Sequence, residues 1–124
     1  WQTGTKVSFC KDETACVYLE LKCVAEAARK GDVLAKGVFE TSAFYLGRGL
    51  AILIDILNPE VIVIGSVFAR CEDLLRPTAM RILEKEALPA AVQRCKIVSA
   101  GLGEAIGDYA ALAIAFAGLS GDLD

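Results

Sequence analysis

A short run of branched aliphatic residues, bounded by residues that end regular structure, constrains the fold of this chain most. Residues 61–64 read VIVI; they follow Asn58 and Pro59, and the run stops at Gly65. Such a run is too short for a helix and is typical of a strand that is buried on both faces. The sequence therefore predicts a strand at residues 60–64, with helices packed on either side of it.

The residues before this strand predict two amphipathic helices. Apolar residues recur at three- and four-residue steps from Thr14 to Arg29; Thr14 is a candidate cap, and Gly31 ends this first helix. Asp32 is placed to cap a second helix of about 25 residues, which Asn58 and Pro59 stop.

Two glycines interrupt the second helix. Gly47 and Gly49 lie well inside it, where each costs up to about 1 kcal/mol relative to alanine. A glycine is useful in a helix where another chain segment comes so close that a Cβ would be in the way. We therefore expect a close approach of another backbone at both positions.

The remainder of the chain predicts helices that alternate with one more strand. A helical stripe covers residues 72–87, with Pro77 in its first turn and Pro89 beyond its end. Residues 96–99 predict a second short strand, and residues 105–117 an alanine-rich helix. The order of helix, helix, strand, helix, strand and helix predicts an α/β fold, rich in helix, with a short parallel strand pair.

The composition predicts that something covers part of the surface. The chain has 124 residues and is 55% hydrophobic, with a mean hydropathy of +0.48, which is high for a domain with this much surface. We expect a homo-oligomer. The longest apolar run, Tyr109 to Leu119, is shorter than the roughly 20 residues that cross a bilayer, so no membrane contact is predicted. The opening residues do not resemble a signal peptide.

Charge, histidine and cysteine usage exclude several kinds of site. The net charge is −3 and the cations are scattered, so no contact with nucleic acid is predicted. The chain has no histidine, and no pair of carboxylates has a spacing that acid/base catalysis demands, so we assign neither a metal site nor a catalytic residue. The cysteines form no C-x-x-C pair, which predicts reduced thiols and a cytoplasmic protein; they are Cys10, Cys16, Cys23, Cys71 and Cys95.

Glycines follow both predicted strands. Gly65 ends the first strand, and Gly101 and Gly103 follow the second. Ligands of open α/β sheets bind at the carboxyl ends of the strands, where these two loops would lie side by side. The spacing is not the dinucleotide fingerprint, because Gly107 falls one place late, and no Walker loop is present. Turns also need glycine for conformational reasons alone, and that interpretation stays open.

Three segments carry a resemblance to a known family. AARKGDVLAK (27–36), LGRGLAILIDILNPEVIVIG (46–65) and IVSAGLGEAIG (97–107) resemble the C-terminal portion of the ROK family of sugar kinases and sugar-responsive repressors. The resemblance covers about residues 25–117. It implies an actin-like, ribonuclease-H-like ATPase fold, of which residues 1–124 would be the C-terminal part. It also implies ATP-dependent phosphorylation of a hexose or hexosamine.

The same resemblance implies a nucleotide site at the strand ends. In the family the first strand ends in a glycine pair against the adenosine of ATP; here Gly65 is kept and Ser66 replaces the second glycine. A serine side chain would narrow this approach, or its hydroxyl would donate to the ribose. The implied cofactor is ATP, with Mg in the whole kinase. The predicted binding residues are Gly65, Ser66 and Val67 at the end of the first strand, and Gly103 in the loop after the second.

Parts that the family's kinases need are absent from this sequence. It has no Asp-x-Gly-x-Thr phosphate loop, no matching proton-accepting aspartate and no His/Cys zinc site, and it begins at Trp1. The resemblance therefore implies a nucleotide-side fragment of a glucokinase-like protein that does not phosphorylate sugar by itself, since sugar and phosphates would be held elsewhere in the whole protein. Two alternatives remain: the sensing and dimerisation half of a sugar-responsive repressor, and a remnant that only mediates association.

Overall fold

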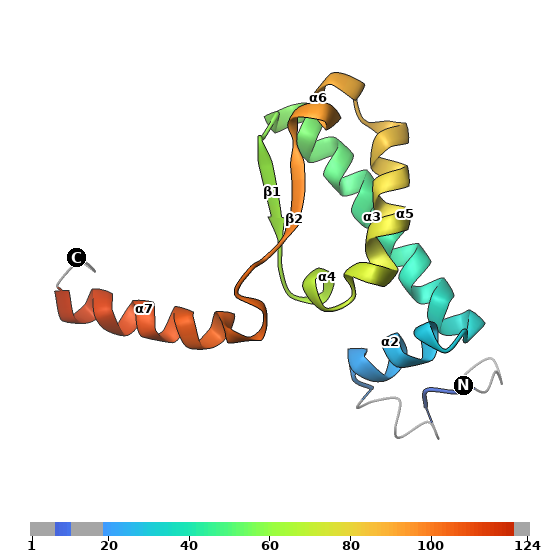
Figure 1. Cartoon of the computed structure of the whole chain (residues 1–124), viewed down its shortest axis with the longest axis horizontal. Coiled ribbons are helices and arrows are strands. Elements are labelled where there is room, and N and C mark those ends of the chain that lie inside the picture. The colour runs from blue at the N-terminus through green and yellow to red at the C-terminus, as the bar shows by residue number, and fades with distance from the viewer. Residues whose placement is uncertain (1–6, 11–18, 121–124) are drawn as a thin grey trace.

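The computed structural model describes residues 7–10 and 19–120 and is built mainly of helices around one small sheet (Figure 1). Helices α3 and α5 pack along each other, α2 lies at the amino-terminal end of α3, and the sheet lies beside α3 and α5. The elements in chain order are α2 (Leu21–Arg29), α3 (Val33–Leu57), β1 (Val61–Ile64), α4 (Val67–Arg70), α5 (Glu72–Glu86), α6 (Pro89–Arg94), β2 (Lys96–Ser99), the 3-10 turn η1 (Gly103–Ala105) and α7 (Ile106–Ser120).

Helix α3 has the ends that its sequence predicts. The Asp32 carboxylate accepts a hydrogen bond of 2.9 Å from the backbone N–H of Ala35, which satisfies a donor of the first turn. The helix runs for 25 residues. Asn58 then takes the left-handed conformation, with φ 44°, and Pro59 follows it. Both the cap and the stop are confirmed.

Helix α2 begins later than predicted. Leu19 and Glu20 are not helical, and α2 starts at Leu21. The predicted cap, Thr14, lies outside the described residues. The predicted end is confirmed, because α2 stops at Arg29 and Gly31 has φ +97°, a conformation that glycine adopts readily.

Only one of the two glycines of α3 marks a close approach. A Cβ built at Gly47 would lie 2.5 Å from the carbonyl oxygen of Ala79 and 2.8 Å from the Cβ of Ile82, both on α5. A Cβ at Gly49 would meet no described atom within 4 Å. Two residues turn a helix by roughly 200°, so the second glycine faces away from α5. The prediction is confirmed for Gly47 and wrong for Gly49.

The two strands pair in parallel, as predicted, but they are covered on one face only. Val61 pairs with Lys96 and Ile64 with Ser99. Ile62 and Ile64 are half-buried against the cluster that α3 and α5 supply, whereas Val61 and Val63 are exposed. Burial on both faces is therefore wrong for the described residues. In Figure 1, α7 extends away from the sheet instead of covering its second face.

The predicted third helix is confirmed as α5, but the predicted place of Pro77 in its first turn is wrong. Pro77 lies inside α5, past the first turn, where the ring removes one backbone donor. The helix continues through it because Leu75, Ala79 and Leu83 bury their side chains on the same face. Two short helices, α4 before α5 and α6 after it, were not predicted. The last predicted helix is confirmed as α7 and runs on to Ser120.

One cysteine departs from the prediction of reduced thiols. Cys10 is disulfide-bonded. The other described cysteines, Cys23, Cys71 and Cys95, are free thiols, so none of them is its partner. The buried thiol of Cys71 has a raised pKa because burial disfavours the thiolate.

Helix α3 is the one described helix long and apolar enough to cross a membrane by length and composition. This is weak evidence, because the core helix of a soluble protein meets the same criteria. Seven of its residues are buried in the protein, among them Phe39, Leu50 and Ile54.

Candidate functional site

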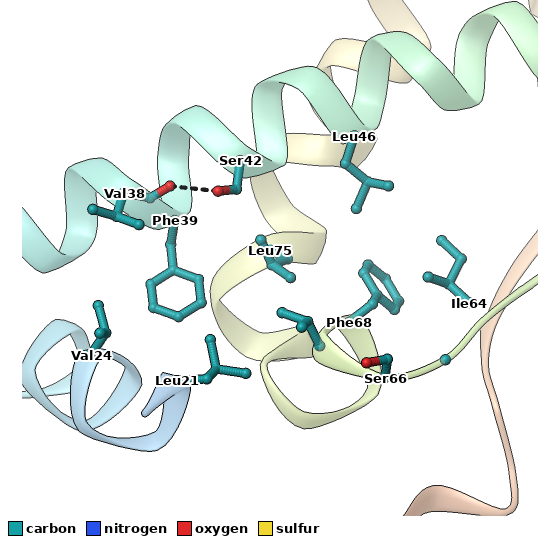
Figure 2. A pocket seen from close by; sticks show the side chains of 12 residues that line it. Leu21, Val24, Val38, Phe39, Ser42, Leu46, Ile64, Ser66, Phe68 and Leu75 are labelled. Atoms are coloured by element: carbon teal, nitrogen blue, oxygen red, sulfur yellow. Dashed lines mark hydrogen bonds between the residues drawn. The ribbon is translucent and has the colours of Figure 1, made fainter. Parts of the chain in front are cut away.

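An apolar cavity opens at the carboxyl end of β1, where the chain turns into α4. Its volume is about 370 Å³. The turn residues Gly65, Ser66 and Val67 all line it. Figure 2 shows the remaining walls: Leu21 and Val24 from α2, Val38, Phe39, Ser42 and Leu46 from α3, and Ile64, Phe68 and Leu75. Three of the four predicted site residues are thus brought together.

The fourth predicted residue, Gly103, lies elsewhere. It is not among the described residues that line the cavity. It has φ +51° and opens the 3-10 turn that leads into α7, where a Cβ would meet no described atom within 4 Å. Its positive φ lets the chain turn, which is the conformational alternative that the sequence left open, and a part for Gly103 in a nucleotide site stays a prediction.

The cavity can hold an apolar or planar group, but its described lining has no charged side chain that would bind a phosphate. None of its described lining residues is charged. The hydroxyl of Ser42 donates to the carbonyl oxygen of Val38 at 2.9 Å, so its proton is already used (Figure 2). In the described part of the chain, no group of three or more His, Cys, Asp or Glu could hold a metal ion. These residues therefore suit an apolar or planar group, and they supply no charged side chain for a triphosphate and no ligand set for Mg²⁺.

Ser66 holds a backbone conformation that suits glycine. Its φ is 53° and its ψ is −123°, a region that side-chain-bearing residues rarely occupy. Its side chain makes no capping hydrogen bond to α4. Gly65 has no such requirement, because a Cβ there would make an ordinary contact of 3.6 Å with the Cβ of Ala100. The backbone thus explains why a glycine would be expected at position 66, and serine is strained there.

We expect Ser66→Gly to stabilise the protein. The substitution relieves a strain of about 1–3 kcal/mol, from which the greater freedom of glycine in the unfolded chain subtracts roughly 0.5–1 kcal/mol. The free energy of unfolding should rise by about 1 kcal/mol, measured by denaturant titration. Ser66→Ala is the matched control, because it keeps the Cβ and the strain while it removes the hydroxyl. If Ser66→Ala raised the free energy of unfolding as much as Ser66→Gly, backbone strain at position 66 would not be the cause.

A polar network connects the carboxyl end of β2 with the cavity wall. Arg76 on α5 donates through Nε to Glu72 Oε1 at 2.5 Å and through Nη2 to the carbonyl oxygen of Ile97 at 3.1 Å. Ser99 donates to the other oxygen of Glu72. The hydrogen bonds from Ser99 and Arg76 lower the pKa of Glu72. The guanidinium also lies over the Phe68 ring, 5.5 Å from its centroid.

Sequence analysis missed this network, although part of it has a local signal. Glu72 and Arg76 are four residues apart on one helix, the spacing at which opposite charges pair. The partners on β2 have no such signal, because they come from more than twenty residues further along the chain.

A second ion pair fixes the α2 wall of the cavity. The guanidinium of Arg29 donates to both carboxylate oxygens of Asp73, each at 2.8 Å, and to the carbonyl oxygen of Arg70 at 3.3 Å. This bidentate pair lowers the pKa of Asp73. It connects α2, whose Leu21 and Val24 line the cavity, with the end of α4 and with α5.

Comparisons with known proteins identify the family. Residues 11–117 match the ROK family. The DNA-binding transcriptional repressor Mlc of Escherichia coli is 35% identical over 81 residues, 65% of this chain and 20% of Mlc. The glucokinase of Halalkalibacterium halodurans is 36% identical over 89 residues, 72% of this chain and 27% of that glucokinase.

A similar solved structure belongs to the same family. The crystal structure of a ROK family transcriptional regulator, a homolog of the E. coli Mlc protein, is similar with a TM-score of 0.65 and 31% identity. The match covers 79% of this chain and 24% of the other. The chain thus spans between 20% and 27% of the length of these relatives. With the match over residues 11–117, these likenesses mean that this chain belongs to the ROK family.

Proposed function

We propose that residues 1–124 are the C-terminal, nucleotide-side part of an actin-like ATPase domain in an ATP-dependent sugar kinase. One observation carries this proposal: the turn of Gly65, Ser66 and Val67 leads from the end of β1 directly onto an apolar cavity of about 370 Å³. Cavities of this size and lining are typical of small-molecule sites. The 36% identity to a glucokinase supports the reaction class, which makes a hexose the candidate substrate.

In this proposal the chain contributes the base-binding wall and leaves the chemistry to the remainder of the protein. The adenine ring of ATP lies in the cavity between α2, α3 and α4, against the turn after β1. The triphosphate and Mg²⁺ extend out of it, because none of the described lining residues carries a charge. Phosphoryl transfer requires that the phosphates be positioned and their charge stabilised. The chain by itself therefore binds nucleotide without transferring phosphate, and the sugar is bound elsewhere in a cytoplasmic enzyme.

The test is calorimetric titration of the chain with ATP and with adenosine. We expect both ligands to bind with dissociation constants within about threefold of each other, since the contacts are to the base. Gly65→Val should weaken both by at least about tenfold, because its branched side chain would crowd Ala100, whose Cβ lies 3.6 Å from the added Cβ, and displace the turn that lines the cavity. Gly49→Ala is the control, as a Cβ there meets no described atom within 4 Å. If Gly65→Val left binding of both ligands unchanged, the turn would not be part of the binding site.

A second candidate function is the sensing and dimerisation half of a sugar-responsive repressor. The observation that favours it is the 31% identity and TM-score of 0.65 to a ROK family transcriptional regulator. A repressor has no need of a glycine at position 66 for nucleotide, and serine is present there. Titration with hexoses and with ATP separates the two: a repressor half responds to sugar and ignores nucleotide. In either case a homo-oligomer is proposed, and the scattered cations favour no contact of this segment with nucleic acid.

A further inference from the structure

We propose that Arg76 is a positioning residue that holds the two strand-end loops together and keeps the Phe68 wall of the cavity in place. Its effect on ligand binding rests on the proposed function, whereas its effect on the loops does not. Arg76 contacts three elements at once: Glu72 on its own helix, the Ile97 carbonyl on β2 and the Phe68 ring on α4.

Arg76 holds the carboxyl end of β2 by two routes. Through its bond to the Ile97 carbonyl, Arg76 fixes the strand near its carboxyl end. Through Glu72 it also fixes Ser99, the last residue of the strand. The next residue, Ala100, donates its backbone N–H to the carbonyl oxygen of Ile64 at 2.9 Å, so the end of β2 in turn holds the end of β1. One guanidinium thus positions both carboxyl ends.

Arg76 also contacts the Phe68 wall of the cavity. Phe68 is 3% exposed, lines the cavity, and stands two residues after the strained Ser66. The guanidinium covers its ring face at 5.5 Å, so the ring is held between the cation and the apolar lining. The turn between β1 and α4 is therefore held from the strand side by Ala100 and from the helix side by Phe68.

Arginine is suited to this arrangement in a way that lysine is not. Its planar fork donates from Nε to a carboxylate and from Nη2 to a carbonyl while its Cζ lies over a ring, 5.5 Å from the centroid. The ammonium of lysine has three donors but no planar fork, so it does not fix the directions of these contacts. Arg76→Lys thus keeps the charge and removes the geometry.

The chain offers a matched control. Arg48 on α3 has the same two kinds of contact, an Nε bond of 3.1 Å to Glu86 and a ring, Phe44, at 5.7 Å. None of these residues is among the described residues that line the cavity. Arg48→Lys therefore removes an equivalent ion pair and ring contact at a place where no strand end depends on it.

The test compares Arg76→Lys with Arg48→Lys by amide hydrogen exchange and adenosine titration. Exchange of the Ala100 amide is measured against that of Lys96, which donates to the Glu60 carbonyl at the opposite end of the sheet. In Arg76→Lys, the Ala100 amide should exchange about tenfold faster relative to Lys96, the effect of losing a charged hydrogen bond of about 1.4 kcal/mol. The ratio should stay unchanged in Arg48→Lys. The adenosine dissociation constant should rise about tenfold in the first variant only.

Two outcomes would overturn the inference. An Ala100 to Lys96 ratio that changes equally in both variants, or in neither, would mean that Arg76 contributes only general stability. Unchanged adenosine binding despite a changed ratio would mean that the loops do not control the cavity. If the unsubstituted chain binds no adenosine, the proposed function fails, and the exchange ratio still decides whether Arg76 positions the loops.

Discussion

Gly47→Ala is expected to lower the free energy of unfolding by about 2–3 kcal/mol, whereas Gly49→Ala, two residues away on the same helix, should raise it by roughly 0.5–1 kcal/mol. The new Cβ at Gly47 would lie 2.5 Å from the Ala79 carbonyl oxygen, which belongs to a buried part of the α5 backbone. A backbone atom cannot turn aside as a side chain can, so the two helices must separate. At Gly49 only the helix-forming advantage of alanine acts, because no described atom is within 4 Å.

The measurement is denaturant unfolding of both variants beside the unsubstituted chain. Opposite signs for the two substitutions are the expected result, and they separate packing from helix propensity, since propensity is the same at both positions. Equal effects at Gly47 and Gly49 would mean that α3 and α5 do not meet as closely as the 2.5 Å contact implies. Gly47→Ala should also loosen the sheet, because Ile62 and Ile64 pack against the cluster between these helices.

The ends of α3 could be predicted from the sequence because they depend on local chemistry. Asp32 caps the first turn within its own segment, and Asn58 with Pro59 ends the last one in the same way. Both strands were predicted as well, the first because four branched aliphatics between Pro59 and Gly65 leave few other conformations. Their burial could not be predicted correctly, because whether α7 covers Val61 and Val63 depends on a contact between segments far apart in the sequence.

The candidate site could be predicted only where it depends on local sequence. The turn at Gly65 was found from the end of its strand. Gly103 was assigned to the site from an expectation that both strand-end loops face one ligand, and the 3-10 turn directs it elsewhere. The strain at Ser66 is a value of φ, and the contacts of Arg76 reach across to β2. Neither a single backbone angle nor a contact between distant segments follows from the order of the residues alone.

Self-association through α7 is the other large effect that we expect. This helix is apolar on all its faces, and its charged residue in the first turn, Asp108, leaves the remainder uncharged. Leu112 is 55% and Ile114 66% exposed, and α7 has its main described contacts with the adjoining turn η1. Burying one such side chain contributes about 1.5–3 kcal/mol, so several of them together offset an association cost of roughly 4–15 kcal/mol.

Light scattering or sedimentation should therefore find a dimer or larger species. Ile114→Glu should raise the dissociation constant of this species by at least about tenfold, because it places a charge where association would bury an apolar side chain. Val33→Glu is the control: it adds the same charge at a position that is 81% exposed, in the first turn of α3, where an acidic residue suits the helix dipole. It should leave the dissociation constant unchanged. A monomer at high concentration in the unsubstituted chain would exclude α7 as an association surface, and an equal loss in both variants would assign association to net charge instead of this helix.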